Sequence, residues 1–246
     1  MTYPVNKSLR TVRMEDILIY EDDDIVLVSK PLDMASLDDK NNRNLKQLAQ
    51  TYYPDLRLCH RLDKNTSGIL LMAKGADNYR TIAMQFEQRE IRKVYHTLVA
   101  GIHSFDGFEI ALPLLISTNK KVTVSNRLGK PSLTRIYTEE TFRHYTLLRC
   151  EPVTGRMHQI RVHLSAVGCP IVGDELYGGT DIMLSQLKRK YKPSGRKEEL
   201  PVNHGYLLHA RSLHFTHPRT GEPMSAEAPY PDNFETTLKV LRKYDL

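Results

Sequence analysis

The hydrophobic pattern near the start of the chain predicts a β-hairpin. Residues 17–30 are Ile-Leu-Ile-Tyr-Glu-Asp-Asp-Asp-Ile-Val-Leu-Val-Ser-Lys, so two short apolar segments flank three consecutive aspartates. β-Branched residues favour strands, whereas a run of charged residues is typical of a turn in solvent. We therefore expect two short strands joined by a solvated acidic turn at 22–24.

Two further segments have a clear pattern. Apolar residues recur at helical spacing over 45–53, which predicts a short helix that Pro54 ends. The uninterrupted apolar run at 69–73, Ile-Leu-Leu-Met-Ala, is typical of a strand covered on both faces. The polar residues 60–68 lie between them, and we expect a loop that leads directly into the buried strand.

Helix and strand patterns continue to alternate along the chain. A helix is predicted over 77–88 with Asp77 as its N-cap, and residues 91–100 return to extended structure. β-Rich segments over 120–150 predict a hairpin, and a helix is predicted from 154 or 155 to 167. The basic residues along the predicted hairpin are Lys120, Lys121, Arg127, Lys130 and Arg135. Because the patterns interleave without a linker, we expect an α+β fold with one mixed sheet.

The composition indicates a folded protein of a reducing compartment. Of the 246 residues, 40% are hydrophobic and 26% are charged, which are ordinary values for a globular chain. Three scattered cysteines are too few for a disulfide framework. Apolar runs stay far below the roughly 18 residues of a spanning helix, and the first residues lack the apolar region of a signal peptide. We expect a cytoplasmic protein without a membrane segment.

The charge makes a polyanionic partner plausible. Lys and Arg number 35 against 29 Asp and Glu, a net charge of +6 that solubility alone would also explain. One Pro- and Gly-containing segment concentrates positive charge, which predicts a surface loop. Its basic residues are Lys188, Arg189, Lys190, Lys192, Arg196 and Lys197.

The segment His60-Arg-Leu-Asp-Lys-Asn-Thr-Ser-Gly68 is the sharpest local feature. Polar loops at strand ends are where rigid scaffolds present catalytic groups. The structural alternative is an Asx or Ser/Thr turn in which Asp63 and Thr66 hydrogen-bond their own backbone. Spacing alone favours this alternative.

A second polar cluster occupies 154–163, Thr-Gly-Arg-Met-His-Gln-Ile-Arg-Val-His. His158 and His163 are five residues apart, which does not place them on one helix face, so no metal site is expected. The structural interpretation is an amphipathic helix with a basic solvated face. The functional one uses Arg161, whose planar guanidinium can pair with a carboxylate or phosphate in a cleft.

Several other chemistries lack their motifs. No glycine-rich phosphate loop, dinucleotide fingerprint or Gly-x-Ser-x-Gly elbow is present. A glycosidase would need a matched acid and base, and the aspartates at 22–24 suit a solvated turn instead.

Taken together, the motifs resemble the RluA family of RNA pseudouridine synthases. The similarity includes the loop at 60–68 with Ala73-Lys74, and it continues almost to the end of the chain. Its later segments are Lys93-Val-Tyr95, Gly155-Arg-Met-His-Gln-Ile-Arg-Val-His163, Gly173-Asp-Glu-Leu-Tyr-Gly178, Leu208-His-Ala210, His217-Pro-Arg-Thr-Gly-Glu222 and Ala228-Pro229. Met157 departs from the family, since that position is often polar.

This resemblance implies a fold, a domain arrangement and an activity. It implies a central mixed, largely antiparallel curved sheet flanked by helices and loops, with an active-site cleft across the sheet. We expect a short extension at 1–16 and one catalytic domain at 17–246, without an amino-terminal S4-type RNA-binding domain. The implied reaction isomerises uridine in RNA to pseudouridine, with no metal and no cofactor.

Residue roles follow from the same resemblance. Asp63 matches the essential aspartate of the family, and Arg61 the neighbour that helps to fill the space left by a flipped base. Tyr95 matches the aromatic residue that stacks on the target uracil, and Arg161 the partner of the aspartate. The residues alone leave two routes open, because a carboxylate could attack the anomeric carbon or remove the proton of the neighbouring ribose carbon.

The expected partner is a structured RNA, ribosomal or transfer, and no obligatory protein partner is evident. The basic segment is expected to contact phosphates through Lys188, Arg189, Lys190 and Lys192. Two alternatives differ in class. A catalytically silent RNA-binding protein on the same fold would tolerate loss of Asp63, and a glycosidase acting on small nucleosides would need a second placed carboxylate and no basic segment.

Overall fold

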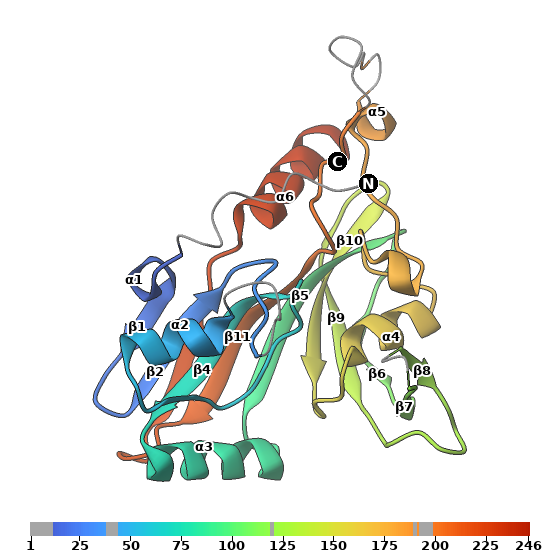
Figure 1. Ribbon diagram of the computed structural model, residues 1–246. Helices are drawn as coiled ribbons and strands as arrows, with labels where there is room; N and C mark the ends of the chain where they lie inside the picture. Colours follow the sequence, from blue (N-terminus) through green and yellow to red (C-terminus); the bar gives the residue numbers. More distant parts are fainter. Residues whose placement is uncertain (1–11, 38–43, 119–120, 189–190, 192–198) are drawn as a thin grey trace. The chain divides into compact units, whose positions relative to one another are not determined.

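A computed structural model describes the chain except residues 1–11, 38–43, 119–120, 189–190 and 192–198 (Figure 1). Backbone contacts divide it into two compact units that interleave in sequence. The first unit contains residues 1–93 and 210–229, and the second contains 94–209 and 230–246. The prediction of one catalytic domain at 17–246 stays a prediction.

The first unit is built on antiparallel strands. Its strand order is β1-β2-β4-β11, and β3 and β12 pair with β4 and β11. The strands are β1 (Leu18–Glu21), β2 (Ile25–Lys30), β3 (Leu56–Leu58), β4 (Ser67–Lys74), β11 (Leu208–Thr216, in this unit from Ala210 on) and β12 (Pro223–Glu227). β1 and β2 form the predicted hairpin, and every residue of β4 except Lys74 is buried, as the apolar run predicts.

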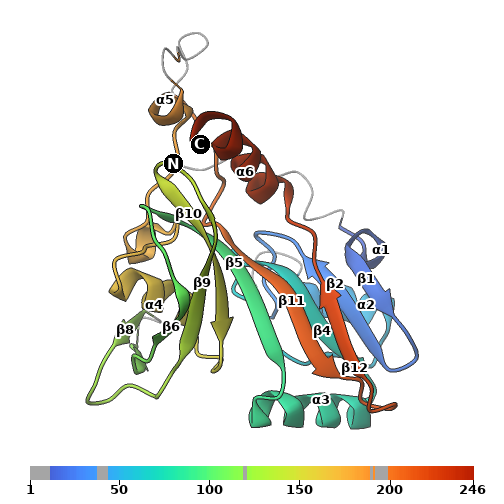
Figure 2. The same cartoon turned by 180° about the vertical axis from the view of Figure 1, so that it is seen from behind.

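Three helices accompany these strands. They are α1 (Met14–Ile17), α2 (Leu45–Tyr52) and α3 (Ala76–Gln88). α2 lies in front of the β2–β4 strands in Figure 1 and behind them in Figure 2, whereas α3 lies across the end of β4. α2 confirms the predicted helix, and Asn44 caps it by accepting the backbone N–H of Gln47.

The second unit is also built on antiparallel strands. Its strand order is β5-β10-β9-β6, and β7 and β8 form a separate hairpin. The strands are β5 (Arg92–Ala100, in this unit from Val94 on), β6 (Asp106–Ile110), β7 (Leu114–Ile116), β8 (Val122–Val124), β9 (Thr134–Thr141) and β10 (Tyr145–Pro152). β5 confirms the predicted strand, and the region from 120 to 150 contributes to two hairpins rather than one.

Helices of the second unit pack on these strands. They are α4 (Gln159–Ala166), the 3-10 turn η1 (Glu175–Tyr177), α5 (Leu184–Leu187) and α6 (Asp232–Tyr244). α4 covers a core that includes Leu148, Ile160 and Leu164, and α6 contributes Phe234, Leu238 and Leu241 to a second core. The predicted fold class, α+β with largely antiparallel strands flanked by helices, is confirmed. The cleft across the sheet stays a prediction.

Two predicted helix starts are wrong. The N-cap of α3 is Gly75, with φ +80°, two residues before the predicted Asp77, which falls in the first turn. α4 begins only at Gln159, because the backbone of His158 is left-handed at φ 52°. Among the described residues, no helix is long and apolar enough to cross a membrane.

Candidate functional site

Asp63 lies in the irregular segment between β3 and β4 and is half-buried. The Thr66 backbone N–H donates to the Asp63 carbonyl at 3.0 Å, which closes a turn immediately before the buried strand. Leu62 points inward with 6% of its surface exposed, and Arg61 is exposed. A backbone turn therefore presents a carboxylate just before a buried strand. The predicted side-chain hydrogen bonds of Asp63 and Thr66 stay a prediction.

Ser36 fixes the backbone directly before Asp63. Its hydroxyl accepts the Leu62 N–H at 3.0 Å and donates to the Leu62 carbonyl at 2.8 Å. Ser36 is 4% exposed, so water competes little with these bonds. One buried side chain thus satisfies both backbone groups of the residue that precedes the carboxylate.

Lys30 fixes the backbone directly after Asp63. This last residue of β2 is fully buried, and its ammonium donates to the carbonyls of Pro31, Met34 and Lys64 at 2.9, 2.8 and 3.0 Å. Burial lowers the pKa of Lys30 to about 7, although the negative charges of Asp63 and Asp33 act in the opposite direction. The Asp63 backbone is therefore held on both sides by buried polar groups.

The sequence analysis missed both of these residues. Lys30 had a usable signal, because it follows Val26 and Val28 at strand spacing and both of those residues are buried. A lysine at an inward position of a buried strand needs hydrogen-bond acceptors, because an unbonded buried charge is costly. Ser36 had no comparable signal, since its partner Leu62 lies 26 residues away.

His60 in the same loop has a structural role. Its Nε2 accepts the backbone N–H of Leu71 at 3.0 Å, and its ring lies 4.9 Å from that of Phe86. Burial, and secondarily the charge of Lys93, lowers the pKa of His60 to about 3. The imidazole is neutral at physiological pH, so it is unsuited to donate a proton there.

Gly68 lets β4 approach its neighbour closely. It has φ +114°, and a Cβ atom at this position would lie 2.2 Å from the carbonyl oxygen of Ala210. Such a contact is impossible without moving backbone. The last residue of the motif therefore carries a packing requirement.

In the second unit, Arg161 is buried in α4 and not part of a solvated face. Its exposed fraction is 7%, which makes the amphipathic interpretation of this helix wrong. Nε and one terminal nitrogen donate to the two carboxylate oxygens of Asp174, both at 2.7 Å. The guanidinium also lies over the rings of Tyr177 and Tyr206, at 4.9 and 4.4 Å. The predicted pairing of Arg161 with Asp63 stays a prediction.

The other polar residues of this helix region bind the backbone around it. Gln159 donates to the Leu133 carbonyl and to Thr134 at 2.9 and 3.0 Å, and its oxygen accepts from Thr154 at 2.7 Å. His163 is fully buried, and burial lowers its pKa. The Nδ1 of His163 lies 2.9 Å from the Thr134 hydroxyl, so its ring belongs to the same network.

Tyr95 lies on β5 opposite Cys150 of β10 and packs against the core that α4 covers. Its stacking role stays a prediction. Asp63 and Arg61 belong to the first unit, whereas Tyr95 and Arg161 belong to the second. That the four residues form one site also stays a prediction.

Of the predicted RNA-binding segment, Lys188 is described and is exposed. Arg189, Lys190 and Lys192 lie outside the described residues. Their predicted contacts with RNA stay a prediction.

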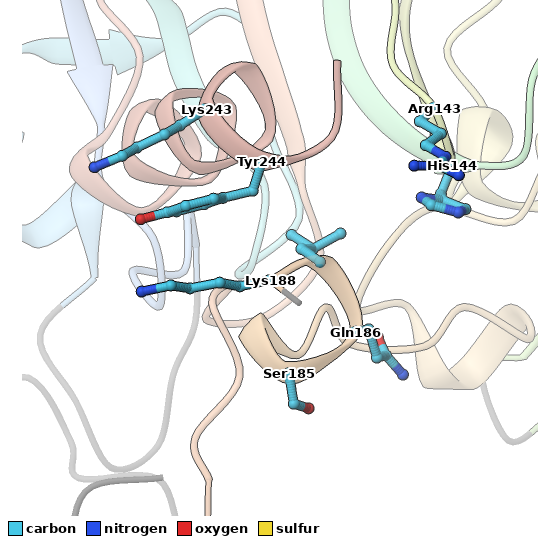
Figure 3. A pocket seen from close by; sticks show the side chains of 8 residues that line it. Arg143, His144, Ser185, Gln186, Lys188, Lys243 and Tyr244 are labelled. Atoms are coloured by element: carbon cyan, nitrogen blue, oxygen red, sulfur yellow. The ribbon is translucent and has the colours of Figure 1, made fainter. Parts of the chain in front are cut away.

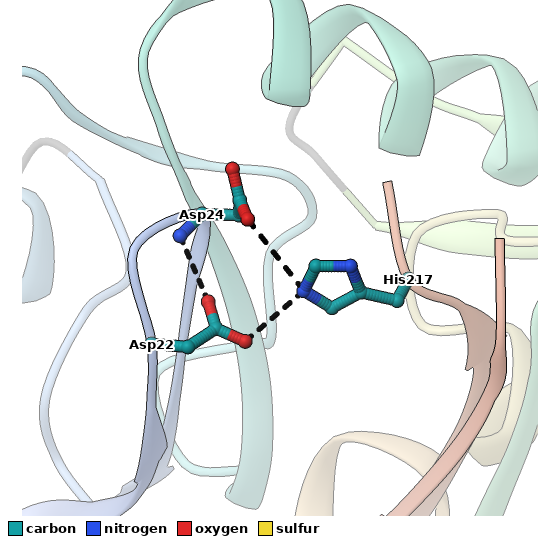
Figure 4. A group of neighbouring side chains, drawn as sticks. All are labelled: Asp22, Asp24 and His217. Atoms are coloured by element: carbon teal, nitrogen blue, oxygen red, sulfur yellow. Dashed lines mark hydrogen bonds and ion pairs between the residues drawn. The ribbon is translucent and has the colours of Figure 1, made fainter. Parts of the chain in front are cut away.

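A cluster of Asp22, Asp24 and His217 has the composition of a metal site (Figure 4). His217 Nδ1 accepts the backbone N–H groups of Arg219 and Thr220, so its Nε2 carries the hydrogen and donates to Asp22 at 3.0 Å. Arg219 pairs with Asp24 at 2.7 Å. The oxygen and nitrogen atoms that could bind a metal are therefore engaged in hydrogen bonds and an ion pair within the protein. These interactions link the β1–β2 turn to the β11–β12 turn.

The same cluster corrects the prediction of a solvated acidic turn. Asp24 is only 4% exposed. Burial raises the pKa of Asp22, but hydrogen bonds from the N–H groups of Asp24 and Ile25, the Tyr20 hydroxyl and His217 outweigh it and bring the pKa below its usual range. Within the turn Asp23 is exposed, as predicted, whereas Asp24 is buried beside Arg219, and Asp22 is partly buried beside His217.

Comparisons with known proteins agree with this architecture. A sequence model of the RNA pseudouridylate synthase family matches residues 24–166. The chain is 34% identical over 251 residues to ribosomal large subunit pseudouridine synthase C of Vibrio vulnificus, covering 98% of this chain and 74% of that protein. It is 33% identical to synthase D of Haemophilus influenzae, covering 92% and 70%.

Solved structures extend the comparison to the fold. Human RNA pseudouridylate synthase domain containing 4 superposes with a TM-score of 0.70 at 22% identity, covering 93% of this chain and 94% of that one. Human domain containing 1 gives a TM-score of 0.67 at 24% identity, covering 94% and 96%. These two show the fold, and the sequence matches show the family. The chain belongs to the RluA-type family of RNA pseudouridylate synthases and is a pseudouridine synthase.

Proposed function

We propose that this enzyme converts specific uridines of structured large-subunit ribosomal RNA to pseudouridine, with Asp63 as the catalytic carboxylate. The substrate class rests on the ribosomal names of relatives that match nearly the whole chain. The residue assignment rests on the way Ser36 and Lys30 hold the backbone on both sides of Asp63. We further propose that it acts in the cytoplasm without a metal or cofactor.

The carboxylate suits the reaction. A carboxylate can act as a nucleophile or as a general base. The bond between N1 of uracil and C1′ of ribose breaks, the base turns, and C5 bonds to C1′ while C5 loses its proton and N1 gains one. Asp63 either attacks C1′ and is displaced when C5 bonds there, or removes the proton of C2′, which is returned when C5 bonds to C1′. Both routes require a carboxylate held still beside the ribose.

The other predicted residues would serve access and placement. A base in structured RNA must leave its stack, which costs a few kcal/mol. A base on an aromatic ring recovers about 1–3 kcal/mol, and we assign this role to Tyr95. Arg61, exposed beside Asp63, is suited to fill the space that the base leaves. Arg161 would support the carboxylate from α4.

The decisive experiment compares the parent with Asp63→Asn. The variant removes the negative charge and keeps the shape, so we expect turnover to fall by at least about 100-fold while the fold and RNA affinity stay near parental. Tritium release from RNA carrying 5-tritiated uridine measures turnover, because the C5 hydrogen leaves in the reaction. Protein-free bacterial large-subunit ribosomal RNA is the substrate, and transfer RNA is assayed in parallel.

Asp55→Asn is the matched control. Asp55 also lies just before a strand of this unit, but it is exposed and pairs with Arg57 at the surface. It should keep parental turnover. Activity of Asp63→Asn within tenfold of the parent would refute the catalytic assignment, and tritium release from transfer RNA alone would refute the ribosomal substrate.

A further inference from the structure

An open basic hollow lies in the second unit, and Lys188 is the one lining residue that has been assigned a role above. It has a volume of about 740 Å³ and is formed by the β9–β10 turn, the region of α5 and the end of α6. It is lined by one cationic side chain from each segment, Arg143, Lys188 and Lys243, and by the His144 imidazole. None of its lining residues is acidic.

Tyr244 organises two of these cations. The ammonium of Lys243 lies 5.2 Å from the centre of the Tyr244 ring, and that of Lys188 lies 5.6 Å from it. Figure 3 shows the ring between the two lysine side chains, with all three pointing the same way. Attraction to the electron-rich ring offsets the repulsion between the ammonium groups, which stay exposed.

Asp245 holds the opposite wall in place. Its carboxylate accepts the backbone N–H of His144 at 2.9 Å and also bonds the His144 imidazole, while its carbonyl accepts the N–H of Arg143 at 2.6 Å. Asp245 is 1% exposed. A buried carboxylate thus joins the β9–β10 turn to the end of α6, so two of the three segments that form the hollow are held together by the fold.

We propose that this hollow binds the phosphate backbone of the RNA substrate. This inference rests on the proposed function, because it takes the ligand to be RNA. Exposed cations around a concave surface match closely spaced phosphates, which release counterions when they are neutralised. Both lysines lie against the Tyr244 ring, so the ring stabilises the ammonium groups. Contacts of these groups with phosphates do not depend on the base sequence of the RNA.

The test measures binding of a fluorescently labelled RNA stem-loop as a function of KCl concentration. In Lys188→Gln/Lys243→Gln the two ammonium groups disappear, so affinity should fall severalfold at low salt. The log–log salt slope should also flatten by roughly 0.7 to 0.9 for each lost phosphate contact. Lys188→Arg/Lys243→Arg keeps both charges and should bind like the parent.

Lys239→Gln is the matched control, since Lys239 is an exposed lysine of the same helix that pairs with Glu235 and does not line the hollow. Acetylation followed by mass spectrometry adds a local readout. Bound RNA should protect Lys188 and Lys243 and leave Lys239 reactive.

The outcomes separate this inference from the proposed function. If the Gln double variant matches Lys239→Gln in affinity and salt slope, the hollow does not bind RNA, even when the parent forms pseudouridine. If the double variant loses affinity and the parent forms no pseudouridine in any RNA, the result supports RNA binding by the hollow and refutes the proposed reaction. Equal protection of all three lysines would also overturn the inference.

Discussion

Lys30 and Arg161 are both buried cations, and the protein compensates their charges differently. Lys30 is fully buried and its ammonium donates to three backbone carbonyls, which are neutral. Arg161 is 7% exposed and faces both oxygens of one buried carboxylate, Asp174. Neutral acceptors offset only part of the cost of burying a charge, and the pKa of Lys30 accordingly falls to about 7.

The difference determines how each region responds to change. A lysine can release its proton when burial becomes too costly, whereas an arginine cannot. The Lys30 region is therefore sensitive to pH, and the Arg161 region is sensitive to the loss of its carboxylate. Since Lys30 lies beside Asp63, the pH-sensitive cation is also the one that holds the proposed catalytic loop.

The largest expected effect comes from Asp174→Asn. This change keeps the shape and removes the carboxylate that binds two guanidinium nitrogens, so the free energy of unfolding should fall by about 3–5 kcal/mol. Urea unfolding measures it. The double variant Arg161→Met/Asp174→Leu replaces the pair by apolar groups and should lose less than Asp174→Asn alone. A double variant that loses more would show that the ion pair itself stabilises the fold.

Arg161→Lys is expected to have the next largest effect. One ammonium cannot donate to both oxygens of Asp174 and lie flat over Tyr177 and Tyr206, so we expect a loss of about 2–3 kcal/mol. Turnover at saturating RNA should fall as well, since the proposed role of Arg161 needs the planar fork. Near-parental stability and turnover together would mean that charge alone suffices at this position.

Lys30→Met tests the pH-sensitive region. In the parent, the folded pKa of Lys30 is about 7 and the unfolded value about 10.5, so between these values the unfolded state binds more protons. Stability of the parent relative to the variant should therefore rise with pH in this window, by about 2 kcal/mol between pH 7 and pH 9. Below pH 7 the full cost of the buried charge is present.

Urea unfolding at pH 6, 7 and 9 measures this trend. Lys74→Met is the matched control, because the Lys74 ammonium is paired with the Glu21 carboxylate at 2.6 Å. A stability difference for Lys30→Met that changes no more with pH than the difference for Lys74→Met would mean that Lys30 keeps its proton throughout.

Local patterns predicted most of the fold. The apolar run at 69–73 identified β4, and helical spacing before Pro54 identified α2. The errors arose where the hydrophobic pattern carries no signal. α4 starts late because the backbone of His158 is left-handed. Asp24 is buried because Arg219, 195 positions later, neutralises it.

The candidate site was predicted unevenly for the same reason. The motif around Asp63 is continuous in sequence, so the resemblance identified it, and the loop contains a backbone turn between Asp63 and Thr66. Asp174 lies in a motif that the sequence analysis quoted, yet no local rule pairs it with Arg161, 13 residues before it. Lys30 and Ser36 act on the Asp63 loop from segments about 30 residues earlier. Such partners become visible only in three dimensions.

Ser36→Ala is expected to have the smallest effect. It tests whether catalysis requires the Asp63 loop to be held as firmly as Asp174 holds Arg161. The change leaves the N–H and carbonyl of Leu62 without the hydroxyl that serves both, at a cost of about 1–2 kcal/mol. Turnover should fall by about tenfold, because small misplacements of a catalytic group are costly, while RNA affinity stays parental. Ser225→Ala, at an exposed position of β12, is the control and should change neither quantity. Stability loss with parental turnover would show that Ser36 supports the fold and does not position Asp63.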